Sequence, residues 1–321
     1  MARIHDHADP FELPVSALGG DTVAVDAYLS LYKHVKGKRG KNGRAITNDE
    51  GEEYAHIVGA WEDARFYLNN DITPVYVFEG GMPDLKVEEH EARREREANA
   101  KENYEAAKAE GDEEGMEKWG ARADSLGREQ VEEVKHLFNL MGVPVFEAPS
   151  EADPQCAQLN QEGTVDYVHT EDFDHILHGV DGLIRRFGGE TGQLVSRQQL
   201  LDDLGYEQHQ MIWRQIVAGC DYNESPWRVG WVRAGDIIEG CQTFEDVIES
   251  TKAYCEDRDD WNWNPERWRK VWDWFENPNV EKDVSIHPGR FKVSDTKDYL
   301  VKRWGLDNRT VQSQLREVIE D

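Results

Sequence analysis

The chain has 321 residues, of which 37 are Lys or Arg and 65 are Asp or Glu, for a formal net charge of -28. This length accommodates one large domain or two small ones, and no stretch approaches the roughly 20 apolar residues that span a bilayer. The start of the chain has no signal-like apolar region and the four cysteines have no close spacing. We therefore expect a cytoplasmic protein without a zinc site or a disulfide framework.

The acidity of the chain would ordinarily argue against a nucleic-acid partner. Its acids, however, are spread along the whole sequence instead of forming a tail. This distribution is typical of proteins from organisms with molar internal salt. Under this interpretation the net charge reflects the solvent, and a nucleic-acid partner stays open.

Apolar runs alternate with helical stretches along the chain. Strands are predicted within 22–32, 73–83, 142–150, 164–174 and 181–189. Helices are predicted over 50–69, 86–141, 151–161 and 208–218. This alternation predicts an α/β fold, a parallel sheet with helices on both faces.

Carboxylates follow four of the predicted strands. The carboxyl ends of parallel strands form the edge of the sheet where ligands bind, so these acids should share one rim: Asp26, Glu79, Glu151, Asp153, Asp172 and Asp174. Asp221 in "GCDYN" (219–223) is a further candidate, although a turn residue at a helix end gives the same pattern. The pair after Ser150 also has an ordinary explanation, in which Ser150 caps a helix and acids occupy its first turn.

Seven converging acids with no histidine or cysteine among them predict bound cations, because so many like charges do not stay ionised together otherwise. An all-oxygen ligand set selects Mg²⁺ or Mn²⁺ over zinc. Two such ions suit in-line displacement at phosphorus. The residues therefore predict metal-dependent phosphodiester hydrolysis.

Five ordered motifs resemble the flap endonucleases, the XPG-like structure-specific 5′ nucleases. They are "VAVDAYLSLY", "VYVFEGGMPDLK", "LMGVPVFEAPSEADPQCA", "TEDFDHILHG" and "GCDYN". "FENPNV" (275–280) and 299–315 are similar to the closing helices of that family, so the resemblance covers nearly the whole chain. It implies a nuclease core with a PIN-like sheet, a helical arch and a helix–two-turn–helix region.

The resemblance implies that all seven acids bind metal, as two Mg²⁺ per site with Mn²⁺ as a substitute. The family usually has Asp at the position of Glu79 and often Glu at that of Asp153. Lys86 and Arg93 match two basic residues at the base of the arch, implied to be catalytic. They lie seven residues apart and should share one helix side, although without the family resemblance a solvated helix face is the better explanation.

Tyr32 matches a tyrosine that stacks on the base beside the cleavage point, the alternative being a core aromatic near Leu29. The stretch "RVGWVRA" (228–234) stands where the family has a glycine-rich loop that holds duplex phosphates with a monovalent cation. Gly230 and Arg233 fit DNA binding there, whereas Arg228 replaces a glycine. Ala2 also stands where the family has glycine.

The resemblance divides one compact domain into an N-terminal nuclease region (1–87), the arch (88–128), an internal nuclease region with the helix–two-turn–helix (129–250) and a C-terminal helical region (251–321). No recognisable clamp-binding tail is present, so use of a sliding clamp stays open. In the tryptophan-rich 259–275, Trp268, Val271, Trp272 and Phe275 follow helical spacing, which favours a buried helix face over a nucleic-acid surface.

The expected function is 5′ flap endonuclease and 5′-3′ exonuclease activity on branched DNA in replication or repair, by a monomer with no membrane association. Two alternatives stay open: a PIN-like ribonuclease, and a non-catalytic or weakened DNA-binding relative. A phosphatase with an aspartyl-phosphate intermediate is disfavoured, because "VAVDAYLS" lacks a D-x-D nucleophile motif. A cellular and a viral origin are equally compatible with the sequence.

Overall fold

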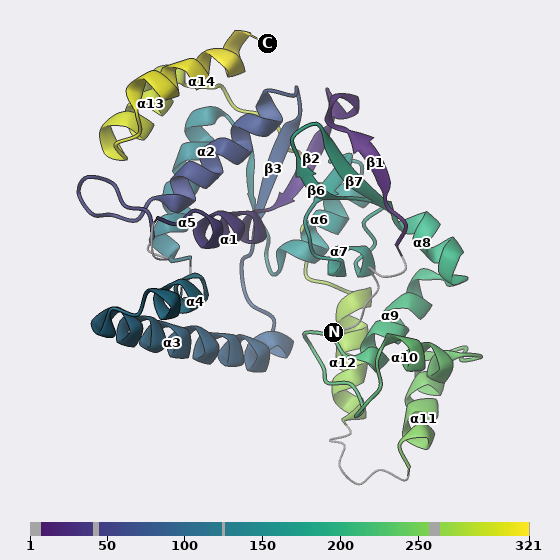
Figure 1. Ribbon diagram of the computed structural model, residues 1–321. Coiled ribbons are helices and arrows are strands. Elements are labelled where there is room, and N and C mark those ends of the chain that lie inside the picture. Colours follow the sequence, from purple (N-terminus) through teal and green to yellow (C-terminus); the bar gives the residue numbers. More distant parts are fainter. Residues whose placement is uncertain (1–7, 41–44, 124–125, 257–263, 321) are drawn as a thin grey trace.

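One seven-stranded sheet organises the computed structural model (Figure 1), which describes residues 8–40, 45–123, 126–256 and 264–320. The strand order is β1-β7-β6-β5-β2-β3-β4. Five strands run parallel: β2 (Thr22–Asp26), β3 (Thr73–Phe78), β4 (Val145–Glu147), β5 (Tyr167–His169) and β6 (Gly182–Gly188). The predicted parallel sheet and all five of its predicted strands are confirmed.

Two antiparallel strands extend the sheet and were not predicted. They are β1 (Phe11–Pro14) and β7 (Thr191–Ser196). A tight turn at Gly189, whose φ of 68° lies in the left-handed region, joins β6 to β7. Strand β1 is an edge strand, and its alternation "FELP" is too short and too polar to signal a strand on its own.

Helices cover both faces of the sheet, as expected. One face carries α1 (Ala27–Gly37), α2 (Ala55–Leu68) and α5 (Arg128–Met141), with α13 (Val293–Asp298) and α14 (Asn308–Glu320) beyond them. The other face carries α6 (Ala152–Gln161), α7 (Asp174–Leu177), α8 (Arg197–Leu204) and α9 (Gln208–Ala218). Each face of the sheet has its own hydrophobic core, and strand β2 contributes to both. Val23 and Val25 face one core, whereas Ala24 faces the other. Short turns lie at η2 (Val15–Leu18) and η5 (Tyr299–Arg303).

The stretch 86–141 was expected to be helical throughout, and this was wrong in detail. A short turn, η4 (Asp84–Lys86), leads into α3 (Val87–Glu110), which is followed by α4 (Glu113–Ala123) and then α5. Gly111 ends α3 with a left-handed φ of 72°, a conformation that glycine adopts at little cost. Helices α3 and α4 pack against each other and project away from the sheet (Figure 1).

Three further helices pack on the α6–α9 face of the molecule. They are α10 (Trp231–Ile238), α11 (Phe244–Tyr254) and α12 (Pro265–Glu276). In α12, Trp268, Val271 and Phe275 are buried and Trp272 is partly buried against the same core. The predicted buried helix face is confirmed there, whereas 259–263 lies outside the described residues. In the part of the chain that the structure describes, no helix is long and apolar enough to cross a membrane.

Candidate metal and nucleic-acid site

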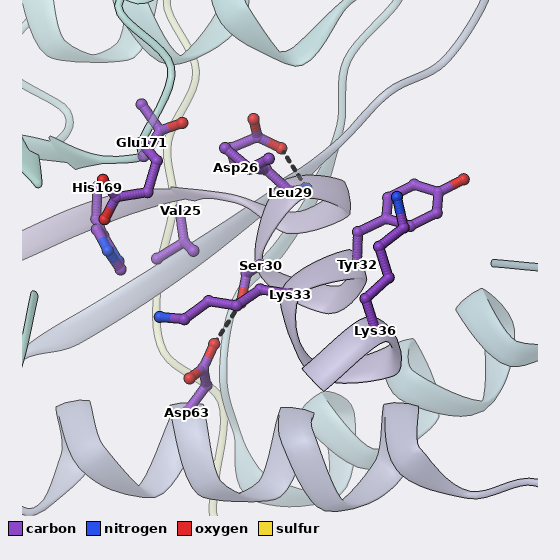
Figure 2. A pocket seen from close by; sticks show the side chains of 11 residues that line it. Val25, Asp26, Leu29, Ser30, Tyr32, Lys33, Lys36, Asp63, His169 and Glu171 are labelled. Carbon is purple, nitrogen blue, oxygen red and sulfur yellow. Dashed lines mark hydrogen bonds between the residues drawn. The ribbon is translucent and has the colours of Figure 1, made fainter. Parts of the chain in front are cut away.

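Asp26 lies at the junction of β2 and α1. Its side chain is 8% exposed and accepts a hydrogen bond from the Leu29 amide at 3.0 Å, so it caps α1 (Figure 2). Burial raises the pKa of the Asp26 carboxyl, and the nearby carboxylates of Glu79 and Asp172 raise it further. His175 and the Leu29 amide oppose this rise. The site thus begins with a carboxylate that the strand–helix junction holds in place.

The loops that follow β3 and β4 touch through their backbones. The Gly80 amide donates to the Ser150 carbonyl at 2.7 Å, and a Cβ at Gly80 would lie 2.0 Å from the carbonyl oxygen of Ala148. The expected Ser150 cap is wrong, because the Ser150 hydroxyl donates to the Gly81 carbonyl at 3.0 Å instead. Glu151 stands at the N-cap of α6 without a side-chain cap. This junction places Glu79 and Glu151 at one rim.

Lys86 lies between carboxylates. Its ammonium donates to Glu151 at 2.5 Å and lies 3.6 Å from an oxygen of Asp221. Burial alone would lower the pKa of Lys86, but Glu151, Asp153 and Asp221 together raise it above its ordinary value. The Tyr222 hydroxyl donates to the second oxygen of Glu151 at 2.5 Å. Tyr222 was not predicted as a site residue, although it directly follows Asp221 in "GCDYN".

The remaining acids crowd the same place. Burial raises the pKa of Asp153, and the carboxylates of Asp172 and Asp26 raise it further. Burial raises the pKa of Asp174 to about 8, with further contributions from Asp172 and Asp221. Asp172 is exposed and accepts from the Asp174 amide at 3.0 Å. The structure therefore brings the seven predicted acids together, as the mutual electrostatic effects of these groups show.

One expectation about this cluster is wrong: a histidine does lie among the acids. His175 in α7 is fully buried, and its Nε2 lies 3.5 Å from an Asp153 carboxylate oxygen. Burial lowers the pKa of His175, while Asp26 and Asp172 oppose that shift. Its position directly after Asp174 in "TEDFDHILHG" could have signalled it.

Arg93 is exposed on α3 and lines a pocket shared with Glu79, Lys86 and Glu151. Lys86 ends the η4 turn and precedes α3, so the prediction that the two cations share one helix was wrong in detail. They nevertheless line the same pocket as Glu79 and Glu151, because α3 begins at the residue after Lys86.

Tyr32 lies on α1, half-buried, in a pocket that also includes Asp26 and Lys36. The Lys36 ammonium sits 5.0 Å from the centre of its ring. Figure 2 shows Asp26 and Tyr32 on the side of α1 opposite Asp63. Leu29 is 37% exposed, so the alternative of a core aromatic grouped with Leu29 is not supported.

The 228–234 loop comprises the end of the α9–α10 connection and the first turn of α10, and it begins seven residues after Asp221. Gly230 is the N-cap of α10, and a Cβ there would meet no atom of the described residues within 4 Å. Arg228, at the expected glycine, adopts a left-handed φ of 61° and places its guanidinium 4.0 Å from the centre of the Trp227 ring. Arg233 donates to the Arg228 carbonyl at 2.6 Å. Ala2 lies outside the described residues.

The donor set fits hard divalent cations. Seven carboxylates from five segments lie close together, and a cation lowers the cost of keeping them ionised. Among the described residues, the compact group of potential ligands is Asp26, Asp153 and His175, whose ligand atoms lie within 4.8 Å of one another. Such a rim, bordered by Lys86 and Arg93, can bind metal and a phosphate together.

Comparisons with sequence families agree with this geometry. The profile of the XPG N-terminal domain matches residues 5–100, and that of the XPG I-region matches 142–221. Flap endonuclease 1 of Candida tropicalis is 33% identical over 311 residues, covering 94% of this chain and 82% of that protein. Flap endonuclease 1 of Leishmania braziliensis and of Homo sapiens are each 34% identical, over 75% and 74% of this chain. The chain spans 63% of the length of each of these two relatives.

Solved structures share the fold. Flap endonuclease-1 from Methanococcus jannaschii matches with a TM-score of 0.74 at 24% identity, covering 100% of this chain and 98% of that one. The catalytic core of Rad2 in complex with a DNA substrate matches with a TM-score of 0.74 at 22% identity, covering 98% of both chains. The expected nuclease-core fold is confirmed.

Proposed function

This chain belongs to the XPG and flap endonuclease family, and on that premise we propose that it is a structure-specific 5′ nuclease of branched DNA. Its activity is 5′ flap endonuclease and 5′-3′ exonuclease cleavage of phosphodiester bonds, in replication or repair. The observation that supports this proposal most directly is the meeting of carboxylates from five segments at one rim, where Glu151, Asp153 and Asp221 lie close to the Lys86 ammonium. A rim of this kind suits a phosphodiester better than a neutral substrate.

The proposed cofactors are two divalent cations, Mg²⁺ with Mn²⁺ as a substitute, held by Asp26, Glu79, Glu151, Asp153, Asp172, Asp174 and Asp221. When bound, such ions activate water and stabilise the leaving oxygen of the phosphodiester. The raised pKa values of Asp26, Asp153 and Asp174 support this assignment, because burial and, after it, the neighbouring carboxylates disfavour the charged forms, and bound cations would favour them.

Lys86 and Arg93 are the proposed catalytic cations of the protein itself. Glu151 and Tyr222 fix the position of the Lys86 ammonium, so it offers a pre-set positive charge beside the phosphate. Arg93 is exposed toward the same pocket and can hold phosphate oxygens with two parallel hydrogen bonds. Lys86 and Arg93 would then stabilise the negative charge that develops on the phosphate in the transition state, with little rearrangement.

The substrate is proposed to extend beyond this rim in two directions. The single-stranded 5′ end passes the α3–α4 pair, and Tyr32 stacks on the base beside the scissile bond, a contact worth about 1–3 kcal/mol. Duplex phosphates are proposed to contact the 228–234 loop through the Gly230 amide and Arg233, with a monovalent cation. In this proposal the nuclease core is formed by 1–87 and 129–250, and the second of these also holds the duplex. The arch is 88–128, and the closing helices lie in 251–321.

The decisive experiment is cleavage of an end-labelled 5′-flap duplex in molar KCl with Mg²⁺, compared with single-stranded DNA, linear duplex and a matched RNA flap. We expect incision near the base of the DNA flap. Binding of the flap without incision, in either Mg²⁺ or Mn²⁺, would instead establish a non-catalytic DNA-binding relative. Preferred cleavage of single-stranded RNA would favour the ribonuclease alternative.

A further inference from the structure

His175 is an imidazole placed inside a carboxylate site. It lies in α7, directly after Asp174, and its side chain is fully buried. His175, Asp26 and Asp153 each offer one possible ligand atom, and these three atoms lie within 4.8 Å of one another. The three residues come from a strand end, the first turn of α6 and the first turn of α7, so the tertiary fold alone brings them together.

Neither ring nitrogen of His175 makes a hydrogen bond of good geometry with the described residues, although the backbone of Asp172 interacts weakly with the ring. Both Nδ1 and Nε2 are buried and unsatisfied, and the neighbouring Asp153 oxygen lies 3.5 Å from Nε2. A buried polar group without a partner costs on the order of 1–3 kcal/mol. Such a group in a native site calls for an explanation, and a bound ion is one of the ordinary explanations.

We propose that His175 is a nitrogen ligand of one cation in this site, which is bound by a mixed set of Asp26, Asp153 and His175. The inference rests on the proposed function in requiring a divalent cation here, and it adds a ligand of a different chemical kind. Oxygen-only sites suit Mg²⁺, whereas imidazole favours transition metals. The chain therefore prefers Mn²⁺ over Mg²⁺ at this position.

A second role for His175 makes different predictions. As a positioning residue it would hold Asp153 by a hydrogen bond and never touch the ion. Removing it would then weaken metal binding through Asp153, without a metal–nitrogen bond ever existing. A measurement that sees nitrogen on the metal separates the two roles, whereas activity alone does not.

The test is pulsed electron paramagnetic resonance of the full chain loaded with Mn²⁺, without DNA, in a nitrogen-free buffer at molar KCl. We expect electron spin-echo modulation from a directly bound ¹⁴N nucleus in the wild type. The modulation should disappear in His175→Gln and persist in His178→Gln, a matched control whose ring packs on Phe275 at 4.9 Å between centroids. Circular dichroism checks that each variant is folded.

A labelling experiment removes any dependence on variant folding. Wild-type protein grown with ¹⁵N-histidine and otherwise ¹⁴N should lose the ¹⁴N modulation and gain that of ¹⁵N. In parallel, the ratio of Mn²⁺ to Mg²⁺ affinity, measured by competition, should fall about tenfold or more in His175→Gln, a loss of the size seen when ligand support is removed.

The outcomes distinguish this inference from the proposed function. Mn²⁺ bound to the wild type without nitrogen modulation would overturn the ligand role. Weaker Mn²⁺ binding in His175→Gln without any nitrogen signal in the wild type would assign His175 to positioning, and would also overturn it. A wild type that binds no Mn²⁺ at all would overturn the metal site of the proposed function itself.

Discussion

Asp172 is one of three exposed members of the acid cluster, with Glu79 and Asp221. Its substitution distinguishes a metal site from an arrangement that only supports the fold. Asp172→Asn keeps the shape of the side chain, so the protein should fold and bind flap DNA with similar affinity. Cleavage should fall more than about 100-fold, because even changes behind metal ligands cost about 10–100-fold. Single-turnover cleavage and DNA titrations measure the two effects. Turnover like that of the wild type in Mg²⁺ would contradict the assignment.

Arg93 is predicted to act in the transition state more than in binding. Arg93→Ala should lower the single-turnover rate by about 10²–10³, the usual effect of removing a preorganised donor, and should change the dissociation constant much less. Arg94→Ala is the matched control, because Arg94 is exposed on the same helix but does not line the pocket. An effect on DNA binding alone would contradict the catalytic role and would indicate that Arg93 is only a charged residue on a solvated helix face.

The stability of the fold is expected to depend on pH through His169. Burial lowers its pKa to about 4, with Lys33 acting in the same direction and Asp63 and Glu171 opposing. The Tyr67 hydroxyl hydrogen-bonds with Nδ1, which suits a neutral ring. The folded pKa lies below the unfolded value near 6.5. The contribution of His169 to the free energy of unfolding is therefore fully present above pH 6.5 and is lost as the pH falls toward 4.

His169→Gln removes this titration while keeping an acceptor for Tyr67. Between pH 6.5 and 4 the wild type should lose up to about 1.4 kcal/mol more per pH unit than the variant. Urea unfolding at a series of pH values measures the difference. Parallel curves for the two proteins would show that His169 does not carry this dependence.

At the scale of the elements, the junction of the loops after β3 and β4 decides how two carboxylates meet. A Cβ at Gly80 would lie 2.0 Å from the Ala148 carbonyl oxygen, so Gly80→Ala must push the two loops apart. We expect a loss of about 1–3 kcal/mol of stability from overpacking. The substitution should also displace the nearby carboxylates, and a displacement of about 1 Å can lower a catalytic rate by about 10²-fold. Melting curves and cleavage rates measure both effects.

Gly81→Ala provides the control for this junction. A Cβ there would lie 3.5 Å from the Pro149 carbonyl oxygen, an ordinary contact, so this variant should behave like the wild type. If both substitutions had equal effects, the close approach at Gly80 would not be the cause. The comparison therefore tests the junction, not the general sensitivity of the loop to a larger side chain.

At the scale of the whole molecule, the net charge of -28 must be reconciled with a polyanionic substrate. At ~0.1 M salt the screening length is about 10 Å, so surface acids repel one another and DNA. At ~1 M it is about 3 Å, and only close neighbours interact. The short contacts made at Lys86 and Arg93 should survive this screening better than the long-range repulsion does.

Thermal stability and flap cleavage should therefore both rise from ~0.1 M toward molar KCl. Each kcal/mol of relieved repulsion corresponds to roughly 2–4 °C in the melting temperature of a domain of ~150–250 residues. Melting curves and cleavage rates across a KCl series test this. A protein that is most stable and most active at low salt would refute the halophilic interpretation, since counterion release would then dominate.

The sequence by itself determined the parallel strands and the acids that follow them. Each depends on local order: an apolar run makes a strand, and its next residue stands at the carboxyl end. The buried face of α12 was equally predictable, because Trp268, Val271 and Phe275 share one helical side wherever that helix packs. The antiparallel β1 and β7 were not, since their pairing depends on contacts between distant segments.

The tertiary structure decided which side chains complete the site. Ser150 looked like a helix cap, yet the approach of the β3 loop at Gly80 gives its hydroxyl the Gly81 carbonyl instead. Tyr222, in the turn after α9, reaches Glu151, and His175 of α7 lies near Asp153, only because α6, α7 and α9 pack on the same sheet face. Local sequence sets the conformation of a segment, but the partners of a side chain depend on neighbours far along the chain, and these are fixed only when the cores on both sheet faces form.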